Sequence, residues 1–263
     1  MAKQLTALPY YGGKHRLSSW IADHLPLRRD YIEPFAGMAS VLLSRPPSHY
    51  ELLNDAAELV VNWWRVVRDD PGSLRRLLKA TPSSRVIMRE AYEVARDSDE
   101  TPLRRAWAFH VVAVSTMSQN VRAGTWRPVG TATGSWTGRR DSADLVSLAE
   151  RMANVELECI DGVELLRRVA RRSTATIYVD PPYRNAATRN YLAKVDHDAL
   201  VEALLAQSGA CAVSGYAGDW PELEAAAWRV TSRAATVTSG PVTGAKRVET
   251  LWLNFTPENT LDL

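Results

Sequence analysis

The most informative stretch of the chain is Thr176-Ile177-Tyr178-Val179-Asp180-Pro181-Pro182-Tyr183. Its first four residues are β-branched or apolar, which predicts a short strand buried in the core of a parallel sheet. The strand has to end at the two prolines, because proline has no N–H group to donate to a neighbouring strand. We therefore expect Asp180 and Tyr183 on a stiff segment at the carboxyl end of a strand. That edge of an open α/β sheet is where ligands bind.

The same stretch suits chemistry on an amino group attached to an aromatic ring. Such a nitrogen is a poor nucleophile, because its lone pair is delocalised into the ring. The Asp180 carboxylate and the Pro181 carbonyl are both acceptors, so they can take the two N–H hydrogens and localise the lone pair. Tyr183 can stack on the ring, a contact worth about 1–3 kcal/mol per base. A strand followed by a proline turn with an aspartate cap is the alternative that this stretch leaves open.

Composition sets broad limits on the kind of protein. The chain has 263 residues, 46% of them hydrophobic and 24% charged, as expected of one large domain or of one domain with a substantial insertion. Cys159 and Cys211 stand in apolar runs and are expected to be buried thiols of a reducing compartment. We see no Cys/His spacing typical of a metal site, no signal peptide, and no apolar run near the roughly 20 residues of a membrane span. We expect a cytoplasmic protein without a metal or a membrane partner.

Two earlier strand ends predict a nucleoside site. Residues 31–43 indicate a strand, a turn that contains Gly37, and then a helix. A second strand over Tyr50–Leu53 ends in Asn54-Asp55, where an acid can accept hydrogen bonds from ribose hydroxyls. Asp55 can also cap the helix that follows, and the two roles are compatible. Gly12-Gly13-Lys14 stands before a helix over Leu17–Leu25, which favours a close approach of backbone N–H groups to an anion, although a plain turn fits as well.

The middle of the chain is predicted to be an inserted block of helices. Apolar residues recur at helical spacing over residues 56–68, 74–78, 86–95 and 103–117. Strand and helix patterns resume after residue 140, with strands over 155–160, 210–213, 229–237 and 248–255. We therefore expect an α/β core from residues 1–58 and 141–263, and an inserted helical recognition subdomain over 59–140.

The end of this insert carries the charge signal. Between Leu103 and Arg140 there are six arginines and no aspartate or glutamate, and Trp126 and Trp136 lie among Gly, Ser and Thr residues. Arginines, aromatic rings and small polar residues together favour a nucleic-acid contact surface over a merely solvated basic loop.

In this order the motifs resemble the Dam-type (D12 class) family of DNA adenine-N6 methyltransferases, which use S-adenosylmethionine. The resemblance covers nearly the whole chain. The matching segments are Tyr11-Gly12-Gly13-Lys14, Glu33-Pro34-Phe35-Ala36-Gly37, Asn54-Asp55, Asp180-Pro181-Pro182-Tyr183, the hairpin-like segment 120–130 and the late strand 247–255. It implies a Rossmann-like class I methyltransferase sheet with helices on both faces.

The resemblance also implies roles for particular residues. The target adenine would be held by Asp180, Pro181, Pro182 and Tyr183. The cofactor would be bound by Tyr10, Lys14, Glu33, Phe35, Gly37, Asp55, Asp161 and Asp180. The DNA would be contacted by Asn120, Arg122, Trp126 and Arg127.

One departure concerns the glycine turn. The family usually has a second glycine where this chain has Ala39, and alanine tolerates that place only with a negative φ. If alanine changes the shape of this turn, the property affected is the affinity for the cofactor.

The expected protein is a site-specific DNA adenine-N6 methyltransferase that extrudes its target base from duplex DNA, with a monomer as the working expectation. RNA adenine methylation, cytosine-N4 methylation and a catalytically silent DNA-binding protein of the same fold stay open as alternatives. No pattern in the sequence indicates which DNA sequence is recognised or whether a partner restriction enzyme exists.

Overall fold

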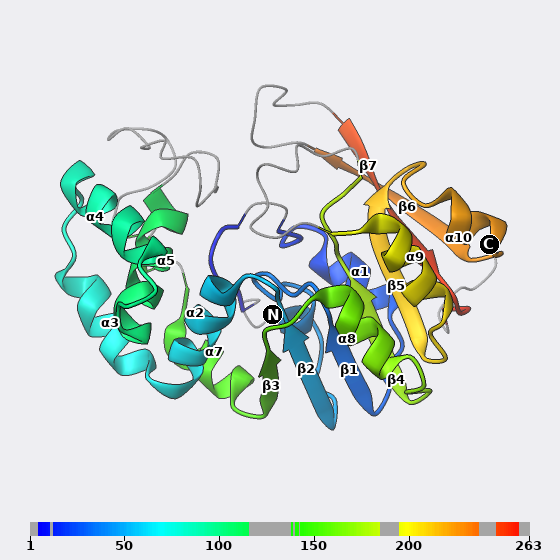
Figure 1. The fold of residues 1–263 in the computed structure, drawn as a ribbon, viewed down its shortest axis with the longest axis horizontal. Coiled ribbons are helices and arrows are strands. Elements are labelled where there is room, and N and C mark those ends of the chain that lie inside the picture. Colours follow the sequence, from blue (N-terminus) through cyan, green and yellow to red (C-terminus); the bar gives the residue numbers. More distant parts are fainter. Residues whose placement is uncertain are drawn as a thin grey trace.

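The computed structural model describes residues 5–10, 13–115, 138, 140–141, 143–184, 195–236 and 246–257. These residues contain a seven-stranded sheet in the order β3-β2-β1-β4-β5-β7-β6 (Figure 1). The strands are β1 (Asp30–Glu33), β2 (Tyr50–Asn54), β3 (Val155–Glu158), β4 (Ala175–Val179), β5 (Ala210–Tyr216), β6 (Arg229–Thr236) and β7 (Lys246–Leu253). Strands β1 to β5 run parallel, and β7 is antiparallel to both of its neighbours.

The strand order changes direction at the centre of the sheet. From β1 the chain proceeds through β2 to β3 on one side, and β4 and β5 then lie on the other side of β1. Strands β1 and β4 pair directly, with Ile32 opposite Ile177. In open α/β sheets this switch point opens a crevice at the carboxyl ends of the strands. The loops after β1 and β4 are thus the ones that can hold a ligand.

Helices cover both faces of the sheet (Figure 1). The described helices are α1 (Ser18–His24), α2 (Glu58–Asp69), α3 (Pro71–Ala80), α4 (Arg85–Arg96), α5 (Pro102–Ser115), α7 (Leu145–Met152), α8 (Gly162–Val169), α9 (His197–Leu205) and α10 (Pro221–Ala225). Several begin at a side-chain cap that the sequence supplies. Asp161 and Asp196 accept backbone N–H bonds at the starts of α8 and α9, and Asp70 does so before Pro71 at the start of α3.

Alternate residues of β1, β2, β4, β5 and β7 enter two different hydrophobic cores. Ile32, Ile177 and Val213 pack on one face with α8, α9 and α10. Tyr31 and Tyr178 point to the other face, where one continuous core joins the sheet to α1 to α5 and α7. The helices of the expected insert share this core with the sheet, and α2 packs on α5, α7 and β3. The division into residues 1–58 with 141–263 and an insert over 59–140 stays a prediction.

Three local expectations need correction. The helix expected after the glycine turn is a single 3₁₀ turn, η1 (Leu42–Ser44), because Pro46 and Pro47 follow and cannot continue a helix. Strand β5 continues beyond the expected range 210–213 to Tyr216, because β7 pairs with Ser214–Tyr216. Cys211 is buried as expected, but Cys159 lies beyond the end of β3 and is only partly buried.

In the part of the chain that the structure describes, no helix is both long and apolar enough to cross a membrane.

Candidate active site

Three strand ends bring the expected functional residues to one edge of the sheet. Asp180 directly follows β4, the Pro34–Gly37 turn follows β1, and Asp55 directly follows β2. Strand β1 pairs with β2 on one side and with β4 on the other, in register. The three loops are therefore neighbours at the switch point, and the Asp180 side chain there is 18% exposed.

The glycine turn after β1 is fixed from three directions. Gly37 has a φ of +48°, a conformation that glycine adopts without strain. Its N–H donates to Asp55 Oδ2 at 2.9 Å, and its carbonyl accepts from Trp64 Nε1 at 2.8 Å. The Tyr10 ring packs against Gly37: a Cβ atom added to the glycine would lie 3.5 Å from Tyr10 Cδ1. Tyr10, Gly37 and Asp55, all predicted cofactor contacts, are thus assembled in one place.

Asp55 serves the fold and keeps capacity for a ligand. Its Oδ1 accepts from the Ala57 N–H at 2.8 Å, just ahead of α2, while Oδ2 holds Gly37. Burial raises the pKa of Asp55, and the two backbone N–H bonds oppose this rise. An ionised carboxylate has about four lone-pair positions, so two ribose hydroxyls could still bind.

Ala39 departs from the condition set by the sequence. Its φ is +48°, not negative, and its N–H closes a turn on the Ala36 carbonyl at 2.7 Å. A left-handed conformation costs an L-residue about 1–2 kcal/mol. The residue is fully buried, and burial of one methyl group contributes about 0.8 kcal/mol in return. The turn therefore keeps the shape that glycine would give it, at a small cost in stability.

Glu33 lies beneath this turn and is buried. Its Oε1 accepts from the Tyr31 hydroxyl at 2.6 Å and from the Leu42 N–H at 2.8 Å. Burial raises the pKa of Glu33 to about 7, against the effect of both hydrogen bonds. In this arrangement Glu33 ties the strand to the segment after the turn, and its contact with a cofactor remains a prediction.

Phe35 and Asp161 stand side by side at the start of α8. Asp161 is exposed and caps the helix through Oδ1, which accepts from the Val163 and Glu164 N–H groups at 2.9 and 3.0 Å. The Phe35 ring packs on Gly162 so closely that a Cβ there would lie 2.4 Å from Phe35 Cζ. Phe35 is partly exposed, so it offers an apolar face next to an acceptor.

Asp180 sits in a hydrogen-bonded network that the sequence did not reveal. Lys14 Nζ donates to its Oδ1 at 2.6 Å, and Ser214 Oγ donates to the same oxygen at 2.8 Å. Since the single Ser214 proton is used there, Tyr178 must donate to Ser214 Oγ, at 3.1 Å. Lys14 is 9% exposed, and its Nζ also lies 3.5 Å from Glu249 Oε1 on β7.

Tyr183 is held firmly in the same cluster. It is 4% exposed, and its hydroxyl donates to Glu249. Burial raises its pKa well above the usual range, so the ring stays a neutral phenol. Lys14 Nζ lies 4.7 Å from the ring centroid, and Tyr216 meets the ring edge-on at the same centroid distance. The adjacent Pro182 carbonyl accepts from His197 Nε2 at 2.8 Å, which fixes the loop.

Part of the basic segment, residues 103–140, lies within the described residues, and three of its arginines there are ion-paired. Arg104 pairs with Glu90, Arg105 with Glu58, and Arg140 with Asp141. Half of the six arginines are therefore neutralised by carboxylates outside the acid-free stretch. The expected DNA contacts Asn120, Arg122, Trp126 and Arg127 lie outside the described residues.

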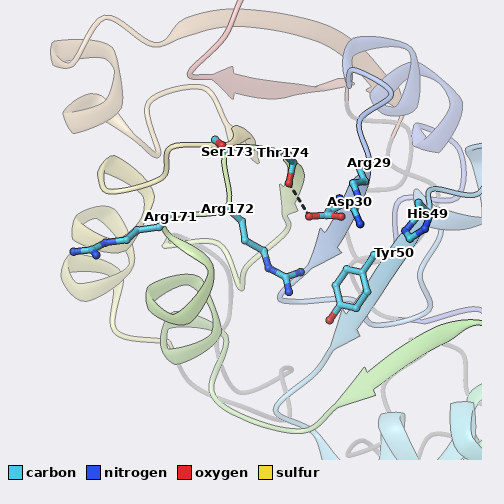
Figure 2. Close-up of a pocket in the computed structure, with 8 residues that line it drawn as sticks. All are labelled: Arg29, Asp30, His49, Tyr50, Arg171, Arg172, Ser173 and Thr174. Atoms are coloured by element: carbon cyan, nitrogen blue, oxygen red, sulfur yellow. Dashed lines mark hydrogen bonds between the residues drawn. The ribbon is translucent and has the colours of Figure 1, made fainter.

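A hollow of about 510 Å³ lies at the opposite edge, near the start of β1 and β2. Figure 2 shows that its arginines do not converge: Arg172 turns to the Tyr50 ring, and Arg171 points away. Asp30 occupies it and accepts from Thr174 at 2.8 Å. The hollow is remote from the predicted motifs and lacks a set of side chains aimed at one ligand.

Sequence reasoning missed Ser214 and Glu249 as members of the site. Ser214 lies just after the strand expected over 210–213, and Glu249 was included only as part of the late strand 247–255. Ser214 is a polar residue in an otherwise apolar strand, which is the signal that could have singled it out. Glu249 lies among Lys246, Arg247 and Thr250, so the sequence of its strand does not distinguish it.

The described residues form a Rossmann-like open α/β sheet, with the predicted site residues at the carboxyl ends of its parallel strands. A profile of the D12 class N6 adenine-specific DNA methyltransferases matches residues 10–200, and the chain belongs to this family. Its methyl donor is S-adenosylmethionine.

Individual relatives are distant. The chain is 25% identical to the DNA adenine methylase of Vibrio cholerae over 195 residues, 72% of this chain and 68% of that protein. It is 28% identical to the Salmonella typhi DNA adenine methylase over 205 residues, 73% and 70% of the two chains.

Two solved structures are also similar. A SAM-dependent methyltransferase from Agrobacterium tumefaciens gives a TM-score of 0.41 at 10% identity, covering 93% of this chain and 61% of that one. A Streptococcus thermophilus rRNA methylase gives a TM-score of 0.36 at 11% identity, covering 90% and 94%.

The residues at the switch point fit this cofactor chemically. A left-handed turn at Gly37 brings the backbone close, and Asp55 has acceptor capacity for ribose hydroxyls. Phe35 offers a partly exposed ring. Within the described residues, no group of three or more His, Cys, Asp or Glu side chains is placed to hold a metal ion.

Proposed function

We propose that the chain methylates N6 of an adenine extruded from duplex DNA, with Asp180 and the Pro181 carbonyl holding the amine. The observation that carries this proposal is the position of Asp180. Asp180 directly follows β4, the strand that pairs with β1, and its side chain is partly exposed and bonded by Ser214. The bound cofactor supplies an electrophilic methyl group on a sulfonium, and the chain supplies the orientation of the attacking nitrogen.

The two acceptors act by position and by charge. The exocyclic amine donates one hydrogen to the Asp180 carboxylate and one to the Pro181 carbonyl, which localises the lone pair toward the methyl group. Positive charge develops on N6 during transfer, and the carboxylate stabilises it. Ser214 keeps the carboxylate in one orientation, while His197 holds the neighbouring Pro182 carbonyl. No covalent intermediate with the protein is needed.

Removal of the base from the helix costs a few kcal/mol of stacking and pairing. Tyr183 offers a neutral aromatic ring for stacking, worth about 1–3 kcal/mol, and phosphate contacts supply the remainder. We propose that residues 120–127 make part of those contacts through Asn120, Arg122, Trp126 and Arg127. The Arg122 and Arg127 guanidiniums suit phosphate oxygens and guanine edges.

Asp180→Ala should lower methyl transfer by at least about 10²–10³-fold, because the carboxylate both orients and stabilises the reacting amine. DNA binding should persist, since most of its free energy comes from phosphate contacts. The measurement is transfer of labelled methyl groups to plasmid DNA at saturating cofactor, beside a filter-binding assay of the DNA. Asp69→Ala is the matched control, because it removes a surface carboxylate paired with Arg68. Normal turnover by the Asp180 variant would refute the assignment.

A further inference from the structure

Lys14 occupies the place that the proposed mechanism gives to the substrate amine. Its ammonium donates to Asp180 Oδ1 at 2.6 Å, as the adenine amino group is expected to do. It also lies over the Tyr183 ring, 4.7 Å from the centroid, where the base is expected to stack. A cation in this position also opposes the positive charge that develops on N6 during transfer. Lys14 and the adenine therefore compete for the Asp180 carboxylate and for the Tyr183 ring.

Glu249 is placed to receive the lysine. Its Oε1 lies 3.5 Å from Lys14 Nζ, compared with 2.6 Å for Asp180 Oδ1, so a short movement of the ammonium would exchange one carboxylate for the other. Glu249 is buried on β7 and is anchored by the Tyr183 hydroxyl. Burial raises the pKa of Glu249, whereas Lys14 lowers it, so a closer lysine would favour the charged carboxylate. Either carboxylate can thus neutralise the buried ammonium.

We propose that Lys14 is a displaceable occupant of the adenine site and that Glu249 is the positioning residue that accepts it when the base arrives. This proposal rests on the function proposed above. Without Glu249, the lysine would have to give up the carboxylate of Asp180 in a poorly solvated site with no exchange for a second buried carboxylate, and the base would compete against an ion pair. With Glu249 present, insertion of the base exchanges one ion pair for another.

The test is a double-mutant cycle between Glu249→Gln and Lys14→Gln. Glutamine at position 249 keeps an oxygen for the Tyr183 hydroxyl but loses the charge. The DNA probe is a duplex oligonucleotide carrying the sequence at which the wild-type protein methylates plasmid DNA. We expect Glu249→Gln to lower the single-turnover rate at saturating DNA by about tenfold, with the Kd values for S-adenosylmethionine and DNA unchanged within about twofold. In the Lys14→Gln background, Glu249→Gln should have no further effect.

Glu51→Gln is the control for the loss of a buried, ion-paired carboxylate. Glu51 pairs with Arg151 near the start of β2, away from the reactive edge, so this variant should lose stability but keep the single-turnover rate. An equal loss of rate from Glu249→Gln in both backgrounds would overturn the proposal and make Glu249 a structural residue. An unchanged single-turnover rate in Glu249→Gln would also overturn the proposal. Lys14 would then pair with another anion, such as the carboxylate of the cofactor, when the base arrives. Absence of methylation by the wild-type protein would instead refute the proposed function.

Discussion

At the scale of single residues, the site is dominated by carboxylates that face very different surroundings. Asp161 is exposed and caps a helix, whereas Glu33 and Glu249 are buried. Burial raises the pKa values of Glu33 and Glu249, because the charged form loses its hydration. A sequence shows five acids at strand or turn positions but not which of them reaches solvent. Exposure leaves Asp161 accessible to a ligand, whereas Glu33 is bonded to Tyr31 and Leu42, and Glu249 accepts from the Tyr183 hydroxyl.

Glu33 should make stability depend on pH. Its pKa rises from 4.5 to about 7 on folding, so the folded state binds the proton more tightly. The stabilisation is fully present below pH 4.5 and is lost as the pH rises through 7, by about 3 kcal/mol in all. Urea unfolding of the wild type and of Glu33→Gln between pH 4.5 and 8 measures it. The free energy of unfolding of the wild type should fall relative to the variant over this range. Parallel curves would show that Glu33 is not protonated in the folded state.

At the scale of elements, helix α8 meets the loop after β1 through one close contact. Gly162 begins the helix, and its missing side chain leaves room for the Phe35 ring. The neighbouring Asp161 cap fixes the start of the helix, so the ring has a defined position. This contact connects the packing of α8 to the side of the sheet where the cofactor is expected.

Gly162→Ala should therefore weaken cofactor binding. A Cβ 2.4 Å from Phe35 Cζ forces the ring to move, and overpacking of this kind costs about 1–3 kcal/mol. We expect the Kd for S-adenosylmethionine to rise by about tenfold in isothermal titration. Gly72→Ala in α3 is the control, since its nearest new neighbour is Arg76 Nη1 at 3.6 Å. That variant should gain about 0.4–1 kcal/mol of stability, because alanine restricts the unfolded chain more than glycine does, with unchanged cofactor binding. Unaltered affinity in Gly162→Ala would remove Phe35 from the cofactor site.

At the scale of the whole molecule, some arginines of the basic segment form ion pairs within the protein, and others are assigned to DNA by the family resemblance. Arg104 and Arg105 lie on α5 and form ion pairs with Glu90 and Glu58, within the helical part of the protein. A raw count of basic residues in the segment therefore overstates the charge available to DNA. Arg122 and Arg127 are the members of the segment that the family resemblance assigns to the DNA.

Replacing Arg122 and Arg127 together by alanine should reduce the salt dependence of DNA binding. Each phosphate contact contributes about 0.9 to the slope of log K against log salt concentration, so the slope should fall by about 2. Fluorescence anisotropy with a labelled duplex at several salt concentrations measures it. Arg105→Ala is the matched control, because its guanidinium is paired with Glu58, and its slope should equal that of the wild type. A double variant with the wild-type slope would exclude both arginines from phosphate contact.

The sequence alone determined the end of β4 before Asp180, the glycine turn after β1 and the family. These features are local: a β-branched run stopped by prolines, or a strand followed by glycine, has the same physical consequence in any parallel sheet. Only the tertiary structure brought Lys14 onto Asp180, 166 positions away, and placed Glu249 and Ser214 beside them. It also showed Ala39 in a left-handed turn and Arg105 bound to Glu58. Burial and long-range pairing depend on which strands become neighbours, and strand order is not written in the spacing of residues along the chain.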